Sequence, residues 1–142
     1  MADLFSSEEL RNLRAFAGTM IPASASYGVP GADDEAIFAD MVKNIGRDLD
    51  DVRTALASLG NIADASPARR LEIANAFRAK GGAALAAIGR VVLLAYYRDD
   101  RVMRSLDQEP RPPFPKGHTV EQGDWSLLDP VKARAPFYRT DK

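Results

Sequence analysis

Most prolines of this chain lie in its last third, and this limits what the chain can fold into. Of the nine prolines in 142 residues, most follow Leu106. Proline has no backbone N–H and a fixed φ, which excludes a long helix or a central strand in this stretch. The stretch also holds many large apolar side chains, including the only tryptophan, Trp125, whereas disordered segments are poor in them. We therefore expect residues 107–142 to form an extended arm that covers another surface.

The residues before the arm place apolar side chains at helical spacing, without the sustained alternation that is typical of strands. Ser6 and Glu9 have the spacing of a capping box, which predicts a first helix that ends before Pro22. The sequence predicts an all-α fold, a small four- to five-helix bundle over residues 1–106, followed by an extended, proline-rich C-terminal arm over residues 107–142.

A loop over residues 21–32 is expected to lead into the second helix. Asp33 or Asp34 is placed to cap that helix. Apolar residues then keep a helical period as far as Leu59, which predicts one long helix that crosses Gly46, the point at which it could kink, and ends near Gly60.

The third helix is expected to begin at Ser66 and Pro67, an N-cap followed by proline in the first turn. Its apolar side is predicted to contain Leu71, Ile73, Ala74 and Phe77. Two glycines, 81–82, separate it from a fourth helix over residues 83–97. Since the fourth helix is apolar on most faces, including Leu94, we expect it to be the most buried one. A short further turn is expected over residues 99–106.

Composition and charge exclude several functional classes. The chain has 19 basic and 20 acidic residues, and its net charge is −1. This balance argues against a partner that is a nucleic acid or an anionic membrane, because such partners bind a strongly basic face. The absence of cysteine excludes disulfides, thiolate metal sites and iron–sulfur clusters. The longest apolar run, interrupted by Arg90, is too short to span a bilayer. Because no secretory or twin-arginine signal opens the sequence, we expect a cytoplasmic location, or a periplasmic one if such a leader has been removed.

Short turn and cap segments occur in a specific order along nearly the whole chain. They are Met-Ile-Pro at 20–22, Gly-Val-Pro-Gly-Ala at 28–32, Ser-Pro at 66–67, Ala-Tyr-Tyr-Arg-Asp-Asp-Arg-Val at 95–102, Pro-Pro-Phe-Pro-Lys-Gly-His at 112–118, and Trp125 followed by Leu-Leu-Asp-Pro-Val at 127–131. In this order the segments resemble the gluconate 2-dehydrogenase subunit 3 family, the small, gamma-type subunits of flavin-dependent sugar and alcohol dehydrogenases.

The resemblance implies a division of labour between two chains. A large partner of the glucose–methanol–choline (GMC) oxidoreductase type would hold FAD and carry out the hydride chemistry, with a cytochrome c as one electron acceptor that the resemblance admits. The small subunit would be needed for folding, stability or export of the large one. This chain would then bind no cofactor or metal itself and would not be an enzyme alone.

The side chains of the arm are the expected contacts with that partner. Interface hot spots favour Trp, Tyr and Arg, and each large apolar side chain contributes about 1.5–3 kcal/mol when fully buried. The expected interface residues are Phe114, His118, Trp125, Leu127, Leu128, Val131, Arg134, Phe137, Tyr138 and Arg139.

Two other functions remain open on the sequence. A stand-alone enzyme would use His118 with a carboxylate such as Glu121 or Asp124, but a zinc site needs three or four ligands and the chain has no second His and no Cys. A self-contained helical adaptor would bind a peptide or helix, with the arm folded back on its own bundle.

Other conspicuous residues are expected to be structural. The carboxylate pairs at 33–34, 50–51 and 99–100 suit a helix cap, a solvated helix face and a capped turn with local ion pairing. Glycines 28, 31, 81 and 82 lack the preceding strand and the spacing of a phosphate-binding loop. Tyr96 and Tyr97 are expected at the edge of the core, where they also offer a seat for the prolines of residues 112–115.

Overall fold

The computed structural model describes residues 4–110 and 121–136, and the regular elements within these ranges are helical. Within these ranges the only β-type pairing is an isolated antiparallel bridge between Ser24 and Val29. The chain divides into a body, residues 1–110, and a second unit, residues 111–142, which falls within the predicted arm.

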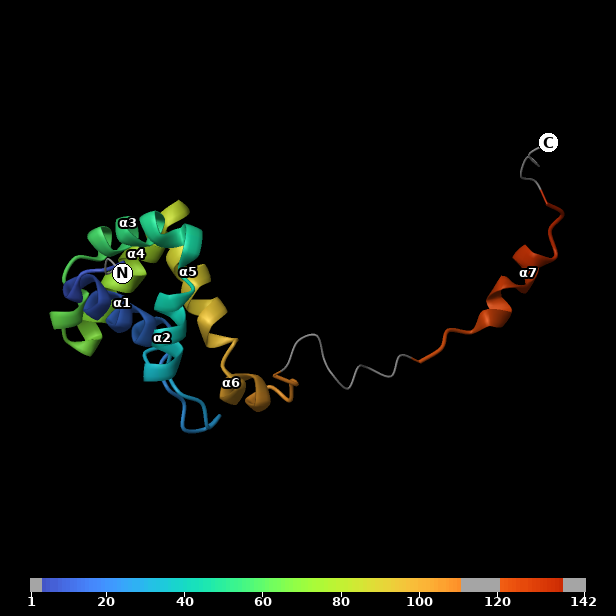
Figure 1. Cartoon of the computed structure of the whole chain (residues 1–142), viewed down its shortest axis with the longest axis horizontal. Coiled ribbons are helices and arrows are strands. Elements are labelled where there is room, and N and C mark those ends of the chain that lie inside the picture. The colour runs from blue at the N-terminus through green and yellow to red at the C-terminus, as the bar shows by residue number, and fades with distance from the viewer. Residues whose placement is uncertain (1–3, 111–120, 137–142) are drawn as a thin grey trace. The chain divides into compact units, whose positions relative to one another are not determined.

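The body is a small all-α bundle, as the sequence predicts (Figure 1). Five helices of two or more turns are followed by one short helix, and two 3-10 turns join them. The elements are α1 (Ser7–Met20), α2 (Glu35–Lys43), η1 (Gly46–Asp48), α3 (Leu49–Leu59), η2 (Ile62–Asp64), α4 (Pro67–Lys80), α5 (Ala83–Tyr96) and α6 (Asp100–Ser105).

The start of α1 is fixed at several points. The predicted capping box is confirmed: the Ser6 hydroxyl accepts a hydrogen bond from the Glu9 N–H, and the Glu9 carboxylate accepts one from the Ser6 N–H. Phe5, just before the cap, is buried in the core. Arg53 of α3 lies over the Phe5 ring and donates a hydrogen bond to the Leu4 carbonyl at 2.6 Å. The first turn is therefore tied to α3 as well as to itself.

The expected long helix across Gly46 is wrong, because the structure has two helices there. Helix α2 ends at Lys43, and Gly46 takes a φ of +51°, a left-handed conformation that a right-handed helix does not contain. The turn η1 then leads into α3. Met41, Ile45 and Val52 are nevertheless all buried. The apolar spacing continues across the break because both helices face the same core.

A bidentate salt bridge joins this break to α5. The Arg90 guanidinium donates to both carboxylate oxygens of Asp48, at 3.2 and 2.5 Å. The hydrogen bonds from Arg90 hold the pKa of Asp48 below its usual range, so the carboxylate is charged at neutral pH. Since Arg90 is the only charged residue of α5, the pair is the one ionic link between this helix and the break.

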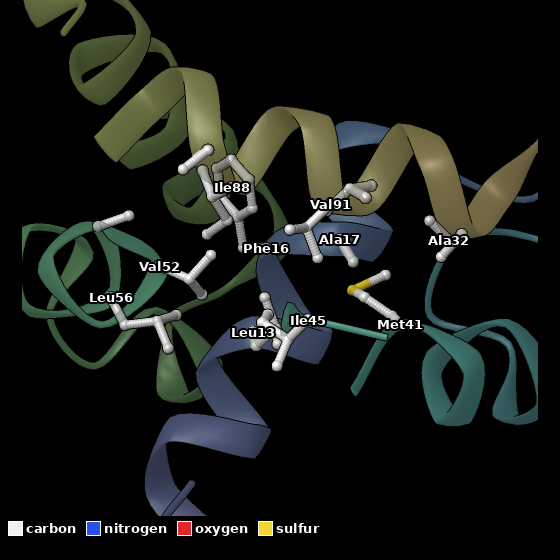
Figure 2. Close-up of a cluster of buried hydrophobic side chains, with 14 of the residues drawn as sticks. Leu13, Phe16, Ala17, Ala32, Met41, Ile45, Val52, Leu56, Ile88 and Val91 are labelled. Carbon is white, nitrogen blue, oxygen red and sulfur yellow. The ribbon is translucent and has the colours of Figure 1, made fainter. Parts of the chain in front are cut away.

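The core lies where α1, α2, α3 and α5 meet. Helix α5 packs against α2 and α3, while α1 packs against α3 and α4. Phe16 of α1 also meets Phe77 of α4 edge-on, with 6.2 Å between ring centroids. Figure 2 shows side chains from these elements converging on one cluster: Leu13, Phe16 and Ala17 of α1, Met41 of α2, Val52 and Leu56 of α3, and Ile88 and Val91 of α5.

Two helices are less completely buried than their sequences suggest. On α4, Phe77 is buried, but Leu71 of the predicted apolar side is 53% exposed. On α5, Ile88 and Val92 are fully buried, whereas Leu94 is 55% exposed. The expectation that α5 is the most buried helix is nevertheless confirmed, because six of its residues are buried, more than in any other helix of the described residues. Its outer side is exposed, because no helix in the described part of the body covers it.

The break at Gly46 gives a test of backbone conformation. Gly46→Ala is expected to lower the free energy of unfolding by about 1 kcal/mol or more, because an L side chain is strained at positive φ. Gly89→Ala is the matched control: a Cβ at either glycine would meet no atom within 4 Å, but Gly89 lies inside α5, where alanine stabilises a helix by about 0.5–1 kcal/mol. Urea unfolding followed by circular dichroism measures both changes, and two changes of the same sign would contradict this explanation.

Candidate partner-binding surface

The described part of the arm contains one short helical segment, residues 125–132, here called the arm helix. It consists of the 3-10 helix η3 (Trp125–Leu128) and one α-helical turn, α7 (Asp129–Lys132). Asp124 caps its start, since its carboxylate accepts hydrogen bonds from the Ser126 hydroxyl at 2.6 Å and the Ser126 N–H at 3.0 Å. These bonds lower the pKa of Asp124 below its usual range, so the cap is ionised at neutral pH.

The large apolar side chains of the arm helix are exposed. Trp125 is 63% exposed and Leu127 is 73% exposed, and Leu128 and Val131 are exposed as well. The only side-chain partner of the Trp125 indole N–H in the described residues is the Gln122 amide oxygen, at 3.4 Å. No residue between 121 and 136 is buried. The arm helix thus presents apolar surface without a core of its own.

The structure describes half of the predicted interface residues. Trp125, Leu127, Leu128 and Val131 lie on the arm helix, and Arg134 follows it, also exposed. The other predicted contacts lie outside the described residues: Phe114, His118, Phe137, Tyr138 and Arg139. The proposed seat of residues 112–115 on the tyrosines also falls outside them.

A second apolar surface, a groove on the body, is not evident from the sequence. The groove has a volume of about 410 Å³ and runs between α1, α4 and α5. Arg78 of α4 is the only charged side chain in its lining among the described residues. The apolar lining residues are Phe16 and Met20 of α1, Leu71 and Ala74 of α4, and Leu85 and Gly89 of α5.

A third exposed apolar area lies at the C-terminal end of α5. Leu93, Leu94 and Tyr97 are all exposed there. Tyr96, by contrast, is buried, and its hydroxyl donates a hydrogen bond to the Pro30 carbonyl at 3.3 Å. The prediction that the tyrosines mark the edge of the core is confirmed in this form: Tyr96 faces inward, and Tyr97 faces solvent with its ring edge-on to Tyr96.

An ionic network fixes the chain next to this exposed area. Arg101 of α6 donates to Asp34, the N-cap of α2, at 2.7 Å, and to Asp99, the N-cap of α6, at 2.8 and 2.9 Å. Arg98 bonds Asp40 of α2 at 2.9 Å. The Arg101 hydrogen bonds hold the pKa values of Asp34 and Asp99 below their usual range. These contacts clamp the end of α5 and the start of α6 onto α2.

The remaining carboxylates and glycines take structural positions. Asp34, not Asp33, is the cap of α2, and Asp50 and Asp51 are exposed in the first turn of α3. Three of the glycines, 28, 81 and 82, have positive φ in a turn or between α4 and α5. Within residues 4–110 and 121–136, no three His, Asp or Glu side chains are grouped so that they could hold a metal ion.

Comparison with known proteins leaves the family of this chain undecided. No protein-family model, no curated protein and no solved structure matches it. The resemblance to the gluconate 2-dehydrogenase subunit 3 family therefore stays a hypothesis that rests on the sequence segments alone. In the part of the chain that the structure describes, no helix has the length and apolar character needed to cross a membrane.

The Arg101 network predicts how stability depends on pH. Because the pKa of Asp34 is lower in the folded state, its contribution is fully present above the unfolded value of about 3.9 and is lost as pH falls through the folded value. Asp34→Asn keeps a good N-cap but removes the charge that Arg101 contacts. We expect this variant to lose up to about 1 kcal/mol at neutral pH and to show a shallower decline in stability on acidification.

The control for this prediction is Asp50→Asn. Asp50 is an exposed aspartate in the first turn of α3, and its carboxylate makes no hydrogen bond within the described residues. Urea unfolding at a series of pH values compares the three proteins. If Asp34→Asn and the wild type lost stability in parallel as the pH fell, the network would not have the role assigned to it.

Proposed function

We propose that this chain is a non-catalytic small subunit that binds and stabilises a large FAD-dependent dehydrogenase acting on sugars or other alcohols. The sequence segments that resemble the gluconate 2-dehydrogenase subunit 3 family supply the identity of the partner. FAD and hydride transfer belong to that large GMC-type chain in this proposal, and the present chain contributes binding surface to the folding and assembly of the complex.

The observation that carries the proposal is the exposed arm helix. Trp125, Leu127, Leu128 and Val131 present large apolar side chains on one short segment. Such a patch in water favours aggregation, so it is typical of a surface that meets another protein. A helix of this length gains little stability from its own backbone. Binding to the partner would therefore both stabilise the helical conformation of the arm helix and remove its apolar side chains from water.

Binding of this kind acts on the partner through mass action. A small subunit that binds the folded large subunit, but not its unfolded chain, stabilises the folded form by about 2.7 kcal/mol at a concentration one hundred times its dissociation constant. No catalytic residue of this chain is needed for that effect. The exposed area at the end of α5, with Leu93, Leu94 and Tyr97, offers a further contact on the body.

Affinity purification of the full-length chain from its own cells tests this function. We expect a large protein to co-purify with it and to carry bound FAD, identified by mass spectrometry and by flavin absorbance. Loss of Trp125 and Leu128 together, as Trp125→Ala and Leu128→Ala, should lower the amount of bound flavoprotein about tenfold or more, because both side chains contribute apolar burial.

Leu4→Ala is the matched control, because Leu4 is an exposed leucine at the other end of the chain, outside the arm helix and the groove. It should capture as much flavoprotein as the wild type does. The large protein, produced without this chain, should be insoluble or lack flavin. A large subunit that was fully active and stable alone would contradict the proposal. Capture of a protein without flavin would instead favour the helical adaptor.

A further inference from the structure

The groove between α1, α4 and α5 has the form of a binding site for an apolar segment. Leu71 and Met20 are exposed at its rim, while Phe16 is buried at its base. The groove is bordered by three helices that pack on the common core, so its shape does not depend on a loop. Apolar grooves between helices commonly bind one face of an amphipathic helix.

Gly89 is an independent sign that something approaches the groove closely. It lies in the interior of α5, where glycine costs about 0.5–1 kcal/mol relative to alanine. The packing of the body does not require it, since a Cβ at this position would meet no atom within 4 Å. A glycine that lines a groove lets another chain come close to the helix backbone. Its cost is explained if the groove is occupied.

The charge of the groove limits what it binds. Arg78 is its only charged lining residue and makes no salt bridge within the described residues. The first turn of α5 contains no acidic side chain that would neutralise the charge of Arg78. An occupant with a carboxylate beside its apolar side chains would pair with Arg78.

The arm helix has the matching chemistry. Trp125 and Leu128 are exposed apolar side chains, and the carboxylates of Asp124 and Asp129 lie directly beside them in sequence. Asp124 is ionised as a helix cap. Within the described residues, the Asp129 carboxylate has a single ionic contact, with Lys132 at 3.5 Å. An apolar surface with adjacent negative charge is what this groove would bind, since Arg78 is its one charged residue and Thr19 and Asn75 are the only other polar residues among its described lining.

Every copy of the chain has both the arm helix and the groove, so two copies can offer each other both surfaces. In a twofold-symmetric pair, one association forms two arm–groove contacts.

We propose that two copies of this chain exchange arms, with the arm helix of each copy bound in the α1–α4–α5 groove of the other. Trp125 and Leu128 enter the apolar groove beside Gly89, and the carboxylate of Asp124 or Asp129 pairs with Arg78. This inference goes beyond the proposed function and does not depend on a flavoprotein, since it concerns the chain alone. The exchange shelters the apolar arm whenever no other partner is bound.

Sedimentation equilibrium of the full-length chain, with Trp125 fluorescence across a dilution series, tests the exchange. Trp125 is the only tryptophan, so its emission reports the arm helix alone. We expect a dimer whose emission moves to longer wavelength as it dissociates. Leu71→Glu blocks both grooves of a dimer and should raise the dissociation constant about a hundredfold, since burial of each leucine is worth about tenfold. Gly89→Ala should also weaken the dimer, although it stabilises the body.

Leu94→Glu is the matched control, because Leu94 is as exposed as Leu71 but does not line the groove; its dissociation constant should equal that of the wild type. A mixture of the Leu71→Glu chain with a Trp125→Ala chain retains one intact arm and one intact groove, so the mixed dimer should be tighter than either variant alone. Circular dichroism confirms that each variant is folded.

Three results would overturn the proposal. The first is a monomer at every concentration, whether Trp125 is accessible to a quencher or protected by its own body. The second is a dimer that Leu71→Glu and Leu94→Glu weaken equally, which would place the contact elsewhere. The third is a mixture of variants that is no tighter than its components, because arm exchange requires that complementation.

Discussion

The packing of α5 against α2 and α3 is the interaction on which the rest of the body depends. Its inner side chains, among them Ile88, Val91 and Val92, meet the core from which α1, α2 and α3 extend (Figure 2). Helix α5 is also apolar on its outer side, where Leu93 and Leu94 are exposed. The helix therefore organises the body on one side and leaves apolar surface on the other.

Ionic contacts determine how the chain passes around this helix. Arg90 holds the break between α2 and α3 through Asp48, and Arg101 holds the N-terminus of α2 through Asp34. Because Asp34 and Asp99 also cap helices, the same carboxylates serve local and long-range order. Charge is thus placed where helices begin and where the chain turns.

Local features of the body were predictable from the sequence, whereas those set by long-range packing were not. The capping box of Ser6 and Glu9 and the Ser66 cap are confirmed because each involves residues within one turn. The break at Gly46 was missed, since apolar periodicity is the same for one helix or for two that face a common core. The exposure of Leu71 could not be predicted, because it depends on which helices happen to cover α4.

The candidate site divides in the same way. The apolar residues of the arm were conspicuous from composition alone, and the structure places Trp125, Leu127, Leu128 and Val131 on one short helical segment. The groove required three helices to be placed in space, and the only sequence signal for it was Gly89 within an apolar helix. A glycine inside a helix can have several structural reasons, and its surroundings must be known to choose among them. The groove could therefore not be inferred from the sequence pattern alone.

The two ends of the body differ in how firmly they are held: the first turn of α1 is attached at several points, and α6 is held less firmly. Helix ends usually fray, but this one is held by its capping box, by buried Phe5 and by the grip of Arg53 on the Leu4 carbonyl. At the other end, the six-residue α6 buries only Val102. Brief local opening, visible as rapid amide exchange, should therefore begin at α6. Opening at this end need not disturb the core, to which α6 contributes only Val102.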